Sequence, residues 1–187
     1  MRGTNDTPAD RTRLASVVLT VIGPDRPGIV ELLSTTIAAH GGNWEQSRMA
    51  HLAGQFAGIL RVTVAQDDVN ALHRALESLA NSGLRVVSEA SAAHERGALR
   101  PYRLSLVGDD REGIVREVSR ALSAQGINVE ELDTHCESAP MSGERLFHAS
   151  ALLHVPAKLE IDELRKTLEA LADDLMVELK LVAAADR

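Results

Sequence analysis

The sequence predicts an α+β protein in which one βαββαβ module occurs twice in tandem. The first observation behind this prediction is a repeat, because VIGPDRPGIV at residues 21–30 returns as LVGDDREGIV at residues 106–115. The second is the order of apolar patterns, which is the same around both copies of the repeat. The length agrees, because 187 residues suffice for two modules of about 85 residues, each with its own core.

Each copy opens with a strand and a helix. Apolar residues alternate over 17–21 and 104–106, which is typical of a strand with one buried face. Apolar residues then recur at spacings of three and four over 29–37 and 114–122, which predicts an amphipathic helix. A glycine follows each helix closely and is the usual stop signal at a helix C-terminus.

A hairpin, a second helix and a closing strand complete each copy. The hairpin strands are expected at 43–53 and 55–65 and at 128–138 and 144–155, the helices at 69–79 and 161–171, and the closing strands at 84–88 and 176–182. This order is the split βαβ, or ferredoxin-like, arrangement, in which an antiparallel sheet carries both helices on one face. The other face of each sheet is expected to be covered by the other copy or by a partner chain.

The expected organisation has four parts. Residues 1–13 have the composition of a disordered tail, residues 14–93 form the first module, residues 94–101 a linker, and residues 102–187 the second module. The separation between matching residues grows from 85 to 91 across the hairpin, so the second copy is six residues longer. The extra residues lie around 138–145, where Pro, Gly and Ser indicate a loop.

The composition argues against several classes of protein. A net charge of -7 without a basic run, together with only 2% aromatic residues, makes direct binding to DNA or RNA an unexpected function. Cys136 is the only cysteine, which leaves neither an internal disulfide nor a paired-cysteine metal site. A polar N-terminus and the lack of a long apolar run predict a cytoplasmic protein without a membrane span.

The loop between the first strand and the first helix resembles that of a known family. It reads GPDRPG at 23–28 and GDDREG at 108–113, and the strand after the helix follows GGN at 41–43 and GIN at 126–128. These motifs resemble the D-R-P-G loop and the ligand-contacting Asn of the ACT family, over nearly all of residues 14–185. The resemblance implies amino-acid-sensing modules that usually pair sheet to sheet, with a ligand that often lies where modules meet.

One stretch of the second copy, residues 128–156, resembles a narrower family. Its A-P-M-S-G, L-F and V-P segments are similar to the glycine cleavage system transcriptional repressors, which consist of two ACT modules and little else. This resemblance implies a cytoplasmic, non-enzymatic regulator, without a cofactor, that senses an amino acid such as glycine and acts through a DNA-binding protein. We expect a homodimer, because other two-module members of the superfamily often associate further.

Two other functions stay open at this stage. One is an ACT protein that senses a different small ligand in another pathway. The other is a regulatory subunit that confers allostery on a separate enzyme, which would copurify with that enzyme and leave transcription unaffected. Neither requires a catalytic residue in this chain, and the sequence contains no P-loop and no serine elbow.

The candidate binding residues occupy matching positions in the two copies. They are Asp25, Arg26, Gly28 and Asn43 in the first copy and Asp110, Arg111, Gly113 and Asn128 in the second. The free N–H groups at the start of the helix suit the carboxylate of an amino acid, and glycine permits close approach. The aspartate can accept the ammonium group, and the asparagine carries both a donor and an acceptor.

Each of these residues also has a purely structural explanation. Asp25 and Asp110 have the position of helix N-caps, which contribute about 1 kcal/mol each. The glycines can allow tight packing of helix on sheet, and the asparagines can shape the turn into the strand. The second loop has Glu112 where the first has Pro27, and this negative charge near the expected carboxylate predicts a weaker or idle second site.

Three histidines and the cysteine of the second hairpin have no assigned role. His148 and His154 share one face of their expected strand, so a metal site is conceivable, but half-exposed strand histidines are the commoner case and no metal is expected. His135 and Cys136 are adjacent in a strand and point to opposite faces, so they cannot act together as a nucleophile and its base.

Overall fold

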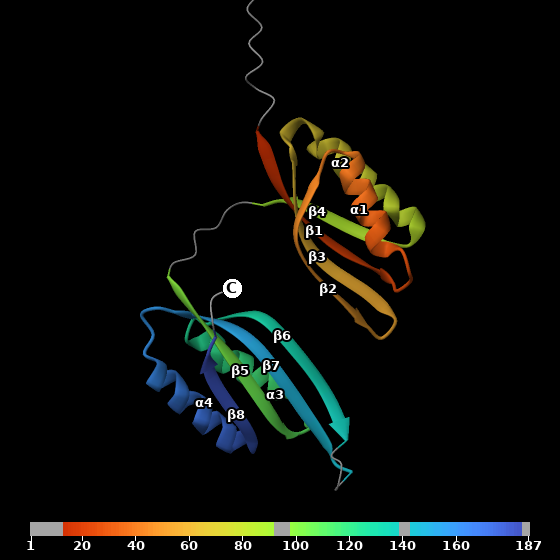
Figure 1. The fold of residues 1–187 in the computed structure, drawn as a ribbon. Coiled ribbons are helices and arrows are strands. Elements are labelled where there is room, and N and C mark those ends of the chain that lie inside the picture. Colours follow the sequence, from red (N-terminus) through yellow and green to blue (C-terminus); the bar gives the residue numbers. More distant parts are fainter. Residues whose placement is uncertain (1–12, 92–97, 139–142, 185–187) are drawn as a thin grey trace, which may run out of the picture. The chain divides into compact units, whose positions relative to one another are not determined.

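In the computed structural model the chain forms two compact units, Met1–His94 and Glu95–Arg187 (Figure 1). The described residues are 13–91, 98–138 and 143–184. The tail expected at 1–13 lies outside them except for its last residue.

Both units have the predicted order of elements. The first contains β1 (Leu14–Pro24), α1 (Ile29–Ala39), β2 (Asn43–Leu52), β3 (Gln55–Ala65), the 3-10 turn η1 (Gln66–Asp68), α2 (Val69–Ser78), the 3-10 turn η2 (Leu79–Ser82) and β4 (Arg85–Ala90). The second contains β5 (Leu99–Asp109), α3 (Ile114–Ala124), β6 (Asn128–Ser138), β7 (Arg145–Pro156), α4 (Ile161–Leu175) and β8 (Val177–Ala183). The antiparallel strand orders are β2-β3-β1-β4 and β6-β7-β5-β8, and the helices of each unit cover one face of its sheet (Figure 1). The prediction of two ferredoxin-like α+β modules is confirmed.

The start of the second sheet differs from expectation. β5 begins at Leu99, inside the linker expected at 94–101, because its first residue pairs with Pro156 at the end of β7. The hairpin between β6 and β7 contains the expected insertion, of which residues 139–142 lie outside the described residues.

Side-chain alternation along the central strand builds the core of each unit. Val17, Leu19 and Val21 of β1 point toward the helices and are at most 4% exposed. Leu33 and Ile37 of α1 lie one turn apart and pack into the same core. Burial of a side chain of this size contributes about 1.5–3 kcal/mol. The second unit has the same arrangement around β5 and α3.

The helices that cover these cores are short. α1 and α3 have 11 residues each, and α4 has 15. Within the described ranges, no helix has the length and apolar character that crossing a membrane requires.

A glycine in the first strand of each unit lets the last strand begin close beside it. A Cβ on Gly23 would lie 2.6 Å from the carbonyl oxygen of Gly83, and a Cβ on Gly108 would lie 2.5 Å from a methyl carbon of Val177. A larger residue would therefore push β4 or β8 away from the sheet. The first glycine of the repeated loop motif is a packing requirement of the fold.

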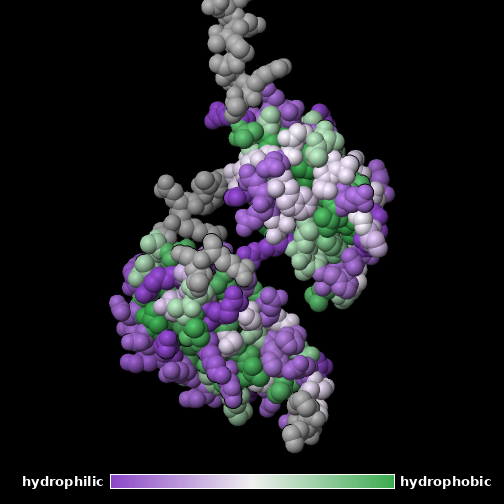
Figure 2. All heavy atoms as spheres, in the orientation of Figure 1, coloured by the Kyte–Doolittle hydropathy of each residue, from purple (hydrophilic) through white to green (hydrophobic). Residues whose placement is uncertain are grey.

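The face of each sheet away from its helices carries exposed side chains. In the first unit this face includes Ile22, Ile59 and Val87, which are 37–50% exposed. In the second unit the corresponding face is more polar and includes Arg103 and Ser105. Figure 2 shows hydrophilic and hydrophobic residues interspersed on the visible surface of both units.

The turn before the last strand is made by different residues in the two units. In the first it is Gly83, with φ of 78°, and in the second it is Met176, with φ of 49°. Arg85 pairs with Ile22, and Glu178 pairs with Val107, the residue that matches Ile22. Gly83 and Met176 each lie two residues before these partners, so they occupy the same place. The left-handed conformation costs a residue with a Cβ about 1–2 kcal/mol but costs glycine nothing. Because Met176 is 76% exposed, little burial offsets this strain.

We therefore expect Met176→Gly to raise the free energy of unfolding of the second unit by about 1 kcal/mol, measured by chemical denaturation. The matched exchange in the first unit, Gly83→Ala, should lower the stability of that unit by a similar amount. A loss of stability in Met176→Gly would contradict this account of the turn.

Candidate ligand site

A main-chain hydrogen bond holds the loop between β1 and α1 to the hairpin end of its own sheet. The Asp25 N–H donates to the Gly54 carbonyl oxygen at 2.9 Å, and the Asp110 N–H donates to the Arg145 carbonyl oxygen at 2.8 Å. Gly54 lies in the turn between β2 and β3, and Arg145 is the first residue of β7. The same bond therefore positions the loop in both units, in agreement with the matching sequences.

The backbone itself requires the glycine at the start of each helix. Gly28 and Gly113 are the N-cap residues, with φ of 90° and 94°, a region that side chains with a Cβ rarely adopt. A Cβ on Gly28 would meet nothing within 4 Å, so tight packing of helix on sheet does not explain this residue. The space beside Gly28 is open to a ligand.

The aspartates do not cap the helices, contrary to the structural explanation given above. The N-cap is the glycine three residues later, and neither N-cap has a side-chain hydrogen bond. The Asp25 carboxylate instead lies 3.7 Å from Nε2 of His51, and the Asp110 carboxylate lies 3.4 Å from Nε of Arg145. Asp25 thus faces a group that is charged only when protonated, whereas Asp110 faces a permanent cation.

The first turn of α1 offers N–H groups beside this loop. The first hydrogen bond within the helix runs from the Leu32 N–H to the Gly28 carbonyl oxygen, so the preceding N–H groups have no partner inside the helix. They carry the partial positive charge of the helix end. The Arg26 guanidinium donates to the Ser82 carbonyl oxygen at 3.0 Å and so ties the loop to the end of η2. Arg111, its counterpart, is exposed.

The asparagines lie far from the loops of their own units. Asn43 pairs with Thr63, which pairs with Ser16 near the start of β1, whereas Asp25 follows Pro24 at the end of β1. Eight residues of strand at about 3.3 Å each separate these positions by about 26 Å. In the second unit, Asn128 has the same place and its side-chain amide donates to Glu130 at 2.5 Å.

One amino acid therefore cannot contact both the loop and the asparagine of a single unit. Asp25, Arg26 and Gly28 lie together, and so do Asp110, Arg111 and Gly113, but each asparagine is at the opposite end of the sheet. The crossover through α1 explains this separation, because the helix returns the chain to the start of the sheet, so β2 runs parallel to β1 and begins at the end opposite the loop.

Sequence reasoning missed the two residues that face the aspartates. His51 lies near the end of β2 and Arg145 at the start of β7, both at the hairpin end of the sheet. The pairing register of the strands would have located His51 and Arg145 beside the loop. The spacing of residues along the sequence does not reveal that register.

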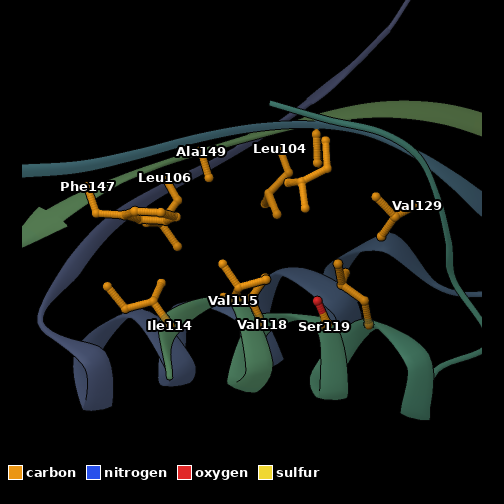
Figure 3. Close-up of a pocket in the computed structure, with 12 residues that line it drawn as sticks. Leu104, Leu106, Ile114, Val115, Val118, Ser119, Val129, Phe147 and Ala149 are labelled. Atoms are coloured by element: carbon orange, nitrogen blue, oxygen red, sulfur yellow. The ribbon is translucent and has the colours of Figure 1, made fainter. Parts of the chain in front are cut away.

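The second unit also contains an apolar cavity of about 110 Å³ between α3 and the sheet. Figure 3 shows Leu106, Phe147 and Ala149 of the strands facing Ile114 and Val118 of the helix across it. Ser119 supplies the hydroxyl group among the lining side chains.

Comparison of the two units explains the cavity, because large core residues of the first unit have smaller counterparts in the second. Trp44 corresponds to Val129, Leu33 to Val118 and Leu60 to Ala151. At three lining positions the second unit has the larger residue, with Leu106 for Val21, Ala149 for Gly58 and Leu132 for Ser47, but the Leu132 side chain is 49% exposed. The cavity is thus a gap in packing that the amino-acid changes leave behind.

The histidines of the second hairpin lie on the face of the sheet away from the helices. His135 and His148 are paired in register on β6 and β7 and their rings stack, with centroids 4.9 Å apart. His154 shares this face but lies six residues along β7 from His148, and its Nδ1 is 3.1 Å from Glu130. The pair considered from the sequence, His148 with His154, is therefore not brought together. Cys136 is exposed, and alternation places it on the opposite face.

Comparisons with known proteins agree with this fold. Residues 15–87 match the ACT domain. The glycine cleavage system transcriptional repressor of Escherichia coli K12 is 24% identical over 162 residues, which cover 85% of each chain. A UPF0237 protein of Methanopyrus kandleri is 33% identical over 82 residues, which are 44% of this chain and 90% of that protein.

Two solved structures cover almost the whole chain. An unknown protein from Galdieria sulphuraria has a TM-score of 0.84 at 34% identity, over 92% of this chain and 100% of that chain. The structure of a candidate glycine cleavage system transcriptional repressor has a TM-score of 0.68 at 18% identity, over 92% of this chain and 99% of that chain, and shows the same fold.

If the cavity is a packing gap, filling it should stabilise the second unit. We expect Ala151→Leu, which installs the residue of the first unit, to raise the free energy of unfolding by about 1 kcal/mol. The matched exchange Leu60→Ala should lower the stability of the first unit by about 2–5 kcal/mol, because it opens a cavity in a filled core. Denaturant titration checks both, and an Ala151→Leu variant less stable than the parent would show that the space is closed in solution.

Proposed function

Because the chain belongs to the ACT-domain family, we propose that it is a regulatory protein without catalytic activity, which binds a small amino acid and acts by contact with a DNA-binding transcription regulator. Glycine, or an amino acid of similar size, is the proposed ligand. The match to the E. coli glycine cleavage system transcriptional repressor over 85% of both chains supports this choice of role and ligand. A regulator of this kind acts in the cytoplasm.

The observation that carries the proposal is the loop before α1. The Asp25 carboxylate can accept the ammonium group of the ligand, since it is 41% exposed and its neighbour His51 is charged only when protonated. The N–H groups before Leu32 can bind the carboxylate. Gly28 leaves the approach to these groups free. Donor and acceptor thus match the two charged ends of an amino acid.

The equivalent loop of the second unit is the weaker candidate. The Asp110 carboxylate already faces the Arg145 guanidinium at 3.4 Å, so an incoming ammonium group must compete with a cation that belongs to the protein. Glu112 adds a negative charge two residues before Ile114, the first residue of α3, where a ligand carboxylate would lie. We infer that the first unit holds the higher-affinity site.

Asn43 can contribute to the same ligand only from a second copy of the chain, because about 26 Å of sheet separates it from Asp25 within its own unit. This requirement is compatible with the homodimer that we expect. The exposed apolar side chains of Ile22, Ile59 and Val87 offer such a dimer a surface on the first sheet.

Titration calorimetry of the purified chain with glycine should give saturable binding. Asp25→Ala should weaken it about 10- to 100-fold, because the ligand loses a charge-assisted hydrogen bond, while Asp110→Ala should change it far less. Asp67→Ala is the matched control: Asp67 is an exposed acid of the first unit that follows β3 at the other end of the sheet. Equal binding by the parent and Asp25→Ala would refute the site but leave the fold untouched.

The partner is tested by affinity purification of the tagged chain with and without glycine. Retention of a DNA-binding transcription regulator, in an amount that changes with glycine, is the expected outcome. Retention of a metabolic enzyme whose activity then responds to the amino acid would instead favour the regulatory-subunit function.

A further inference from the structure

We propose that His135, Glu137 and His148 form a binding site for a divalent transition-metal ion of the Zn²⁺ type on the face of the second sheet away from the helices. The proposal goes beyond the amino-acid-binding function and does not depend on it, because none of the three residues belongs to the loop before α3.

The strand register creates this cluster. His135 of β6 is paired directly with His148 of β7, and Glu137 follows His135 by two residues, so all three side chains emerge on one face. A slip of one residue in either strand would send part of the set to the opposite face. The hairpin therefore determines the relative placement of the three side chains.

The side chains already approach one another closely. One ligating atom from each residue lies within 4.8 Å of the other two, and Nε2 of His148 is 3.1 Å from Oε1 of Glu137. In a tetrahedral site with bonds of about 2.0–2.2 Å, neighbouring ligand atoms are about 3.3 Å apart. Small rotations of the stacked His135 and His148 side chains would therefore bring one nitrogen of each ring to the distances that a tetrahedral metal site requires.

The chemistry of the donor set points to a borderline ion. Two imidazole nitrogens and one carboxylate oxygen suit Zn²⁺ and its neighbours in the first transition row, rather than Mg²⁺ or Ca²⁺, which prefer oxygen ligands. Three protein ligands leave one tetrahedral position for water. Cys136 is not part of the set, because it points to the other face of β6.

His148 has a nitrogen that suits this role. Its Nε2 is shielded from solvent and finds no hydrogen-bond partner of suitable geometry among the described residues, although the Glu137 carboxylate is near. A shielded polar atom without a well-formed hydrogen bond is unfavourable, and bonding to a metal ion would satisfy it.

The first unit shows that the fold does not need these side chains. At the positions of His135, Glu137 and His148 the first sheet carries Ala50, Leu52 and Ala57, and Ala50 pairs with Ala57 as His135 pairs with His148. The same hairpin therefore forms without any potential ligand. Packing of the hairpin does not explain why two histidines and a glutamate gather in the second copy.

The test uses the full-length chain, freed of metal with a chelator and titrated with Co²⁺ and then Zn²⁺. We expect one equivalent of Co²⁺ to give the visible absorption of a tetrahedral ion, and one equivalent of Zn²⁺ to displace it. His135→Ala and His148→Ala should each weaken binding by at least about 100-fold, since loss of outer-shell partners alone costs about 10- to 100-fold.

The matched control is His154→Ala, because His154 lies on the same strand and face but outside the cluster, and this variant should bind metal like the parent. The three substituted histidines, His135, His148 and His154, are at the surface or half-buried, so the variants are expected to fold. Circular dichroism checks that each variant is folded. Absence of a tetrahedral Co²⁺ spectrum in the parent, or equal binding by His135→Ala, would overturn the proposal and leave His148 and Glu137 as an ion pair only.

Transfer of the cluster to the first unit tests whether register alone creates the site. Ala50→His, Leu52→Glu and Ala57→His, introduced together, place the same three side chains on the first sheet. We expect the folded triple variant to bind a second equivalent of Co²⁺ with the same spectrum. Binding of a single equivalent by this variant would show that the β6–β7 pairing does not suffice and would count against the proposed set of ligands.

Discussion

The alternation of side chains along paired strands is the constraint on which the rest of this structure depends. Each second residue of β1 enters the core, and its neighbours face away from the helices, so Leu19 is buried while Thr20 is exposed. Antiparallel pairing carries this alternation across the sheet, and a slip of one residue would reverse it. The same rule that buries Leu153 on one face of β7 places His148 beside His135 on the other.

Duplication makes each unit a control for the other. Two glycines that both copies keep are explained by the fold: Gly23 and Gly108 admit the last strand, and Gly28 and Gly113 adopt a left-handed backbone. Where the copies differ, one unit has a property that the fold does not require. The smaller residue Ala151 in place of Leu60 accompanies a cavity, and His135 with His148 in place of two alanines accompanies the proposed metal site.

The two loops before the helices share a backbone and differ in charge. The main-chain bond from Asp25 to Gly54 has its counterpart in the bond from Asp110 to Arg145, so the approach to the helix N-terminus has the same form in both units. The second carboxylate faces an arginine, whereas the first faces a histidine. A change in the charged residue that faces the loop carboxylate would therefore suffice to make one module respond to a ligand and the other serve a structural role. The backbone of the loop need not change.

Local sequence patterns were enough to predict the fold and the position of the loops. The in-register repeat, the alternation in 17–21 and the helical spacing in 29–37 are local patterns, and local patterns suffice to identify strands, helices and their order. The tertiary structure was needed to establish which residues meet. It separated Asn43 from Asp25, brought His51 to Asp25, and paired His148 with His135 rather than with His154. The reason is physical: such contacts follow from strand register and from the end of the sheet at which each turn lies, and both are properties of pairing between distant segments.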